Sequence, residues 1–142
     1  MKLLKLITLS LCFMMVYGTT WANQQTSAGK LTSNFTMQAY LDAVQHGKLK
    51  GFAQVIDENA KFTMQRGEKL ISQTKSEMLA ALKKLENVEQ NCQVSQSVVQ
   101  SLPNQIIMKV DMKYETFTRV NYVTLSESNS GWKVAQVSTT FI

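Results

Sequence analysis

The clearest pattern in the chain is the alternation of apolar and polar residues from Gln105 to Phe117. Every second position carries an apolar side chain, at Ile106, Met108, Val110, Met112 and Tyr114. The intervening positions carry charges, at Lys109, Asp111, Lys113 and Glu115. A period of two predicts a strand with one buried face and one solvated face. We therefore expect the first row to pack against the core and the second row to be exposed.

Three segments have the apolar spacing of helices. The first begins near Asn34, with Ser33 or Asn34 as its cap, and ends near Gly47. The second is a short helix over residues 49–56, closed by a polar break at residues 57–59. The third begins with a capping box in which Thr74 and Glu77 satisfy free backbone amides.

The remaining apolar positions predict five further strands. They cover residues 61–65, 70–74, 92–102, 118–126 and 132–141, with short turns such as Gly67-Glu68 between neighbours. The element order is then ααββαββββ. Strands that follow one another through short turns favour antiparallel pairing. The sequence therefore predicts an α+β fold with about six antiparallel strands packed on three helices.

The N-terminus has the three parts of a secretory signal. A basic start is followed by an apolar run from Leu6 to Tyr17 and by small residues at Thr20 and Ala22. This run is shorter than the roughly 20 apolar residues of a membrane helix. A buried N-terminal helix or an uncleaved anchor is the alternative. The expected organisation is a signal peptide at 1–22, a flexible leader at 23–33 and one domain at 34–142, in the periplasm or secreted.

Composition narrows the class of protein. The 142 residues include 44% hydrophobic and 18% charged residues, which is typical of one globular domain. Removal of residues 1–22 takes away Lys2 and Lys5, so the net charge falls from +5 to +3. This mild excess is unlike the clustered basic surface of a nucleic-acid-binding protein, so we expect no nucleic-acid partner and, after cleavage, no membrane association. Cys12 is also removed, which leaves Cys92 without a partner for an internal disulfide.

Candidate catalytic groups are few. His46 is the only histidine and lies where the first predicted helix ends, so interaction with the helix dipole is favoured over catalysis. No His, Cys or carboxylate cluster has the spacing of a metal site, and no cofactor is expected. Asp111 and Glu115 share a strand face but lie about 13 Å apart, too far for one acid–base pair. Asp57 is favoured as a turn residue in the predicted polar break.

Several polar or large side chains belong to rows that face inward. The candidate pocket residues are Tyr40, Met108, Met112, Tyr114, Arg119, Asn121 and Trp132. Most Tyr and Trp residues at such positions fill a core and find a partner for their polar tip. An arginine on an apolar face needs an acceptor, so Arg119 either meets an acidic ligand or pairs with Glu115.

Short segments along most of the chain resemble a known family. They include Tyr40-Leu41-Asp42-Ala43, His46-Gly47, Asn59-Ala60-Lys61-Phe62, Arg66-Gly67-Glu68-Lys69-Leu70, Lys75-Ser76-Glu77-Met78, Tyr122-Val123-Thr124-Leu125 and Gly131-Trp132-Lys133-Val134. Over about residues 35–141 the chain is similar to the putative lumazine-binding family of the nuclear transport factor 2-like superfamily. That superfamily includes ketosteroid isomerase-like and polyketide cyclase-like proteins. The resemblance implies a cone-shaped, curved sheet with a pocket inside the cone, and commonly a dimer.

Two classes of function stay open. The first is an exported module that binds a small organic ligand or another partner. The second is an isomerase- or cyclase-like enzyme that uses Asp57 with Tyr114, since enzymes of the superfamily place an Asp with Tyr or His in the pocket. We favour the first because no aspartate clearly enters the inward rows.

A homodimer is the expected assembly. The resemblance implies contact through the outer face of the sheet, which includes the charged row from Lys109 to Glu115. Phe117 lies at its end, and Tyr122 and Thr124 are expected beside it on the next strand. Opposite charges two positions apart can be self-complementary about a two-fold axis. A simply solvated face is the alternative.

Cleavage after Ala22 is the first testable prediction. The exported protein should begin at Asn23, because the apolar run and the small residues before it form a complete signal. The intact mass of the exported protein measures this directly. A mature protein that begins at Met1 would contradict the assignment.

Overall fold

The computed structural model describes residues 29–142, so the predicted signal peptide and the first part of the predicted leader lie outside the described residues. The elements are α1 (Ser33–His46), the 3-10 turn η1 (Phe52–Val55), β1 (Ile56–Arg66), β2 (Lys69–Thr74), α2 (Lys75–Lys83), β3 (Gln93–Leu102), β4 (Gln105–Lys113), β5 (Thr118–Ser128) and β6 (Gly131–Phe141). The α+β class and the six strands are as the sequence predicts.

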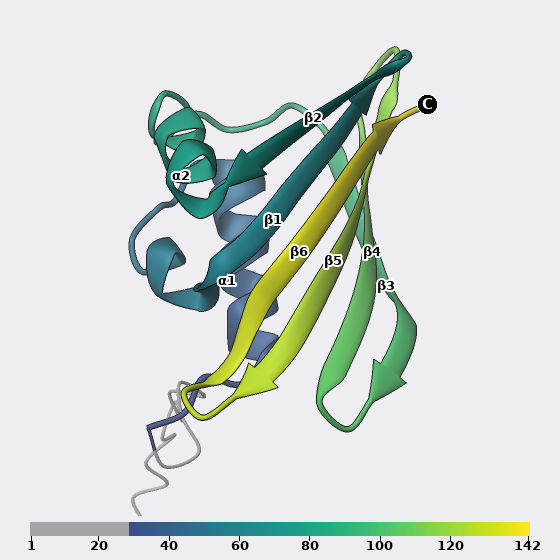
Figure 1. The fold of residues 1–142 in the computed structure, drawn as a ribbon. Helices are drawn as coiled ribbons and strands as arrows, with labels where there is room; N and C mark the ends of the chain where they lie inside the picture. The colour runs from purple at the N-terminus through teal and green to yellow at the C-terminus, as the bar shows by residue number, and fades with distance from the viewer. Residues whose placement is uncertain (1–28) are drawn as a thin grey trace, which may run out of the picture.

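The strands form one curved sheet in the order β2-β1-β6-β5-β4-β3 (Figure 1). Neighbours are antiparallel except β1 and β6, which run parallel. The expectation of a wholly antiparallel sheet is therefore wrong at this pair. After α2 the chain continues at the far edge with β3 and returns through three hairpin connections. The last strand, β6, consequently meets β1 at the centre of the sheet in the same direction.

The described residues form two α-helices and one 3-10 turn, so the prediction of three helices is wrong. The segment expected to be the second helix contains only the four residues of η1. Gly51 has a φ of +79° before it, and Ile56 is already extended after it and pairs with Val134. Only one turn fits between these two points, and the expected polar break at 57–59 is the start of β1. No helix within residues 29–142 is long and apolar enough to cross a membrane.

The predicted capping box at α2 is confirmed. The Glu77 amide donates to Thr74 Oγ1 (3.3 Å), and the Thr74 amide donates to Glu77 Oε2 (2.7 Å). The Thr74 amide and the Thr74 hydroxyl (3.0 Å) both donate to Glu77 Oε2, and these two hydrogen bonds lower the pKa of Glu77. At α1 the cap is one residue earlier than expected, because Thr32 Oγ1 accepts from the Phe35 amide at 3.2 Å. Both helix starts thus depend on a threonine that satisfies a free amide.

Gly47 joins the end of α1 to the loop that follows α2. Its φ of +63° is the left-handed conformation that ends many helices, and its amide donates to the Ala43 carbonyl at 3.2 Å. Its carbonyl accepts from the Asn87 amide at 2.9 Å. A Cβ at this position would lie 2.4 Å from the Leu85 carbonyl oxygen. Glycine is therefore required both by the backbone conformation and by the close approach of the second loop.

The register of β4 follows its alternation. Val110 and Met112 are fully buried, whereas Lys113 and Glu115 are exposed. Lys109 and Asp111 are half-buried and form an ion pair of 3.2 Å. The helices cover the face that contains Val110 and Met112, and Figure 1 shows α1 behind β1 and β6 with α2 beside the end of β2. This concave face holds the core.

Substitution of Met112 by alanine tests the register and the core together. Met112 has no exposed surface, so Met112→Ala should lower the free energy of unfolding by about 2–5 kcal/mol. Its neighbour Lys113 points to solvent, and Lys113→Ala should change that free energy by less than about 0.5 kcal/mol. Chemical denaturation measures both. Equal losses for the two variants would contradict the assigned faces of β4.

Candidate functional site

A cavity of about 390 Å³ opens on the concave face between the start of α1 and strands β3, β4 and β5. We call it the cone cavity. Ser33, Asn34, Met37 and Gln38 line it from α1, and the sheet contributes Gln96, Val98, Ser101, Ile106, Met108 and Leu125. Its volume lies in the range of roughly 300–1,000 Å³ that is typical of small-molecule sites.

The lining of the cone cavity is apolar with uncharged polar groups. Buried or half-buried Met37, Met108 and Leu125 contribute apolar surface. The amides of Gln38 and Gln96 and the hydroxyl of Ser101 supply hydrogen-bond donors and acceptors. Among residues 29–142, no Asp, Glu, His, Cys, Lys or Arg lines it. The cavity can therefore hold an uncharged molecule and orient it by its polar edge.

The position of α1 explains why the cavity exists. The Thr36 hydroxyl donates to the Trp132 carbonyl at 2.7 Å, and Leu31 forms a bridge with Gly131 at the start of β6. These contacts hold the helix over β6, one of the two central strands of the sheet. The concave face of β3 stays uncovered, and Val98, which opposes Met108 across the two strands, is 60% exposed.

A second group of polar side chains lies deeper on the concave face. We call Tyr40, Arg119, Asn121 and Thr139 the inner polar cluster. Asn121 Oδ1 accepts from Arg119 Nε (3.0 Å) and from Thr139 Oγ1 (2.8 Å). Asn121 and Tyr40 are fully buried, yet Asn121 Nδ2 and the Tyr40 hydroxyl have no hydrogen-bond partner within the described residues. Buried polar atoms without partners are rare in native proteins and are a reason to look for a ligand.

Burial controls the protonation of the phenols and the thiol near Arg119. It raises the pKa of Tyr40 to about 12, against the opposing effect of the Arg119 charge. Burial also raises the pKa of Tyr114 and of the Cys92 thiol, and Arg119 opposes both shifts. The Tyr114 hydroxyl donates to Gln90 Oε1 at 3.0 Å. All three groups are therefore neutral near pH 7.

The structure divides the predicted pocket residues between these regions. Met108 lines the cone cavity, whereas Tyr40, Arg119 and Asn121 belong to the inner polar cluster. The other three are core residues: Met112 is fully buried, and the half-buried Tyr114 and Trp132 pack against the core.

Sequence reasoning missed the polar half of the cavity lining. Gln38 follows Met37 on what reads as the solvated side of the first helix. Gln96 and Ser101 lie in a strand whose ten residues are mostly Gln, Ser and Val and whose alternation is weak. A bulge between Val98 and Gln100 shifts the register within this strand. The burial pattern alone therefore could not assign Gln96 and Ser101 to the concave face.

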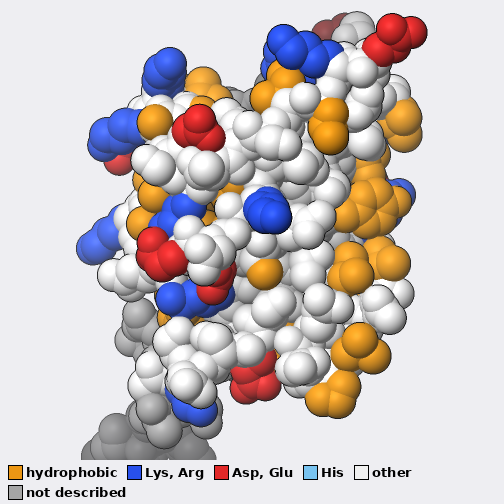
Figure 2. All heavy atoms as spheres, viewed as in Figure 1, with side chains coloured by type: hydrophobic (Ala, Val, Ile, Leu, Met, Phe, Trp, Pro, Cys, Tyr) orange, Lys and Arg blue, Asp and Glu red, His pale blue; other side chains and the backbone are white. Residues whose placement is uncertain are grey.

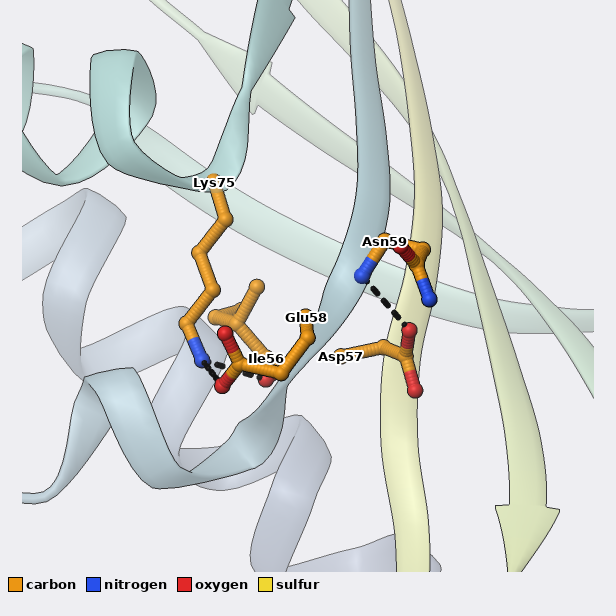
Figure 3. A network of polar contacts seen from close by, with 5 residues as sticks. All are labelled: Ile56, Asp57, Glu58, Asn59 and Lys75. Atoms are coloured by element: carbon orange, nitrogen blue, oxygen red, sulfur yellow. Dashed lines mark hydrogen bonds and ion pairs between the residues drawn. The ribbon is translucent and has the colours of Figure 1, made fainter.

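Asp57 and Tyr114, the suggested acid and its partner, do not come together. Asp57 Oδ1 accepts from the Asn59 amide at 2.8 Å (Figure 3). Glu58 points to the opposite side of β1, where the Lys75 ammonium contacts it and also donates to the Ile56 carbonyl at 3.0 Å. Asp57 thus lies on the side of β1 turned away from α2. The expected turn role is wrong, because Asp57 belongs to β1 and its carboxylate bonds to the backbone of the same strand where the register with β6 is irregular.

The strand register separates Asp57 and Tyr114 along the sheet. Ile56, beside Asp57, is aligned through Val134 of β6 and Leu125 of β5 with Ile106 of β4. Tyr114 comes eight residues after Ile106, roughly 26 Å farther along the strand direction. No acid–base pair can form from these two side chains in this arrangement.

The other titratable candidates also have structural partners. His46, the last residue of α1, places Nδ1 at 3.1 Å from Glu89 Oε1. Asp111 pairs with Lys109 on the outer face. Within residues 29–142, no three His, Cys, Asp or Glu side chains are grouped as a metal site would require.

Solved structures with the same fold are numerous but distant in sequence. An NTF-2-like protein of unknown function from Silicibacter pomeroyi aligns with a TM-score of 0.61 and 12% identity, over 77% of this chain and 90% of its own. An NTF2-like protein from Cytophaga hutchinsonii aligns with a TM-score of 0.59 and 17% identity, over 75% of this chain and 93% of its own. A protein described as a putative ketosteroid isomerase, from Parabacteroides distasonis, aligns with a TM-score of 0.55 and 11% identity, over 76% of this chain and 86% of its own. At these identities the likeness shows the fold alone.

Family membership rests on a separate comparison. No curated protein matches the chain. Residues 32–141, which include every helix and strand of the part that the structure describes, match the family described as putative lumazine-binding. With that match over most of its length and the shared architecture, the chain belongs to the putative lumazine-binding family and has an NTF2-like fold.

Proposed function

We propose that this protein is an exported module that binds a small, uncharged, flat organic molecule in the cone cavity, without catalysing a reaction on it. The observation that carries the proposal is the cavity itself, a space of about 390 Å³ with apolar walls and several uncharged polar groups. Such a combination of apolar surface with a few hydrogen-bonding groups is typical of small-molecule sites.

The cavity lining favours a ring system over a chain or a charged metabolite. The apolar side chains of Met37, Met108 and Leu125 can cover the faces of a ring. Gln96 and Ser101, on the same inward side of β3, can bond to polar atoms at its edge. Lumazine, named in the description of the family, is a flat heterocycle with polar edges and fits this class.

The binding role is better supported than the enzymatic alternative. An isomerase- or cyclase-like reaction needs an acid or base beside the ligand. The lining contributed by the described part of the chain has no titratable side chain, and Asp57 and Tyr114 are far apart along the sheet. The proposal therefore assigns no catalytic residue.

Two serines of β3 allow a matched test of the ligand site. Ser101 opposes Ile106 and lines the cavity, whereas Ser97 opposes Lys109 on the outer side of the same strand. Both are exposed, so Ser→Trp should be tolerated at either position. Lumazine fluorescence should report saturable binding to the natural protein. Ser101→Trp should weaken binding at least tenfold by filling the cavity, and Ser97→Trp should leave it unchanged.

Two results would count against this assignment. One is equal lumazine affinity for the Ser101→Trp and Ser97→Trp variants, which would place the ligand elsewhere. The other is the absence of saturable binding for lumazine and for a panel of neutral bicyclic heterocycles of similar size. In the second case the cone cavity would not be a site for this class of molecule.

We also propose that the protein forms a homodimer through the outer face of the sheet. Figure 2 shows that face: side chains over the central strands are mostly uncharged, and apolar side chains gather along the right-hand edge. The register places Tyr122, 40% exposed, beside Lys109, and Thr124 beside Ile107. Phe117 stacks on Tyr114 with ring centroids 4.6 Å apart, so its ring belongs to an aromatic cluster and is a poorer probe of this face.

A charge at Tyr122 tests the dimer. Tyr122→Asp should weaken association at least tenfold, because it places a carboxylate in the apolar part of the contact. Val88→Asp provides the control, since Val88 is 46% exposed in the loop after α2, away from the sheet. Light scattering at several protein concentrations measures both variants. A natural protein that stays monomeric at all concentrations and salt levels would refute the dimer.

A further inference from the structure

We infer that the inner polar cluster is a binding site for the carboxylate group of a small aromatic acid, distinct from the cone cavity. Its members Tyr40, Arg119 and Asn121 present hydrogen-bond donors on the concave face. Among the described residues the Tyr40 hydroxyl and Asn121 Nδ2 have no acceptor, and Arg119 donates only to the neutral Asn121 Oδ1. The inference does not depend on the function proposed for the cone cavity.

The charge of Arg119 is the first part of the argument. Arg119 lies on the inward row of β5, half-buried, and pairs across the strands with Met112 and Phe141. Within residues 29–142, no carboxylate oxygen lies within 4.0 Å of its guanidinium, and Glu115 is exposed to solvent. A guanidinium is always charged and binds planar carboxylates through two parallel hydrogen bonds. Asn121 Oδ1 is a neutral partner, so the guanidinium can still bind an anionic group of another molecule on the concave face.

The orientation of Asn121 adds a second donor. Its Oδ1 already accepts hydrogen bonds from Arg119 Nε (3.0 Å) and Thr139 Oγ1 (2.8 Å). Arg119 can only donate, so this network fixes which end of the amide is oxygen. The Nδ2 group then points away from both partners, fully buried and without an acceptor. A hydrogen-bond acceptor on the ligand would satisfy the Nδ2 group of Asn121.

The Tyr40 hydroxyl is the third donor. It is fully buried without a partner, and Arg119 is close enough for its charge to act on the phenol. Because burial raises the pKa of Tyr40 to about 12, the phenol keeps its proton at neutral pH and can donate. Three donors, one of them cationic, match an anionic acceptor.

Aromatic rings beside Arg119 indicate the rest of the ligand. Phe141 is directly opposite Arg119 on the neighbouring strand. The Phe117 ring lies 6.0 Å from the Phe141 ring and stacks on Tyr114 at 4.6 Å, and Phe117 and Phe141 are 41% and 38% exposed. These exposed rings border the half-buried guanidinium, so a planar apolar body would contact aromatic faces while its carboxylate bonds to Arg119.

The site and the cone cavity occupy different parts of the concave face. Met108 lines the cavity, and Arg119 is level with Met112, four residues farther along β4. The fully buried Val110 and Met112 follow Met108 on this inward row. Variants at Arg119 and Ser101 therefore report on separate sites.

Nuclear magnetic resonance of the purified protein tests the inference with benzoate and its neutral analogue benzamide. Benzoate should shift the Arg119 Nε–H and the Asn121 side-chain amide signals to saturation, and benzamide should not. Arg119→Gln should weaken benzoate binding at least about tenfold, since it removes a hydrogen bond between charged groups. Lys84→Gln removes the same charge from the exposed end of α2 and should bind benzoate as the natural protein does.

Tyr40→Phe separates ligand binding from folding. The variant should bind benzoate several-fold more weakly, because one donor is lost. It should also raise the melting temperature of the unliganded protein by about 3–8 °C, because it removes a buried hydroxyl that has no partner. A merely structural role for Tyr40 predicts the opposite change in melting temperature.

The inference fails if benzamide binds as tightly as benzoate, or if Arg119→Gln binds benzoate like the natural protein. It also fails if benzoate produces no saturable shift at Arg119 and Asn121 while inorganic phosphate does, because the site would then select a different oxyanion. Lower stability of the Tyr40→Phe variant would show that the hydroxyl is satisfied within the fold.

Discussion

The hydrogen bond from the Thr36 hydroxyl to the Trp132 carbonyl, 2.7 Å long and on a fully buried threonine, fixes where α1 crosses the sheet. Both candidate sites follow from this position. Because the helix lies over β6, its first turn leaves the concave face of β3 and β4 uncovered and bounds the cone cavity. Because Tyr40 follows Thr36 by one turn, the same placement buries its hydroxyl in the fold interior, where the Arg119 charge acts on it.

The two sites differ in the chemistry that they can recognise. The cone cavity has apolar walls and neutral amides and hydroxyls, so it suits a molecule whose polarity lies at its edge. The inner polar cluster has a cation and two unpaired donors, so it suits an anion. Burying such donors costs free energy in the unliganded protein, about 1–3 kcal/mol for each unsatisfied group. Under our proposal, binding of an anionic group would recover part of this free energy.

The sequence predicts correctly those structural features that depend on the local pattern of residues. Strict alternation identifies the inward row of β4, and Val110 and Met112 are fully buried as that row requires. The capping box at Thr74 and Glu77 appears in the structure with both hydrogen bonds. Arg119 and Asn121 also face inward as their positions among apolar residues predict. In each case neighbours in the chain carry enough information to decide the structure.

Features that depend on distant contacts are beyond the sequence pattern. The parallel pairing of β1 with β6 joins segments more than seventy residues apart. The apolar spacing of residues 49–56 suits a helix, yet pairing of Ile56 with Val134 extends the backbone and leaves room for one turn only. The separation of Asp57 from Tyr114 follows from the same pairing. The polar lining at Gln96 and Ser101 depends on a register shift in β3, and the apolar periodicity of the sequence does not predict that shift.

The methionine methyl groups offer the most direct test of the proposal that the cone cavity binds a small organic molecule. Met37 and Met108 line the cone cavity, whereas Met78 is a buried residue of α2 outside that lining. With methyl-labelled methionines and bound lumazine, intermolecular nuclear Overhauser effects should connect the ligand to the methyl groups of Met37 and Met108. Effects at Met78 but at neither of these two would contradict the account.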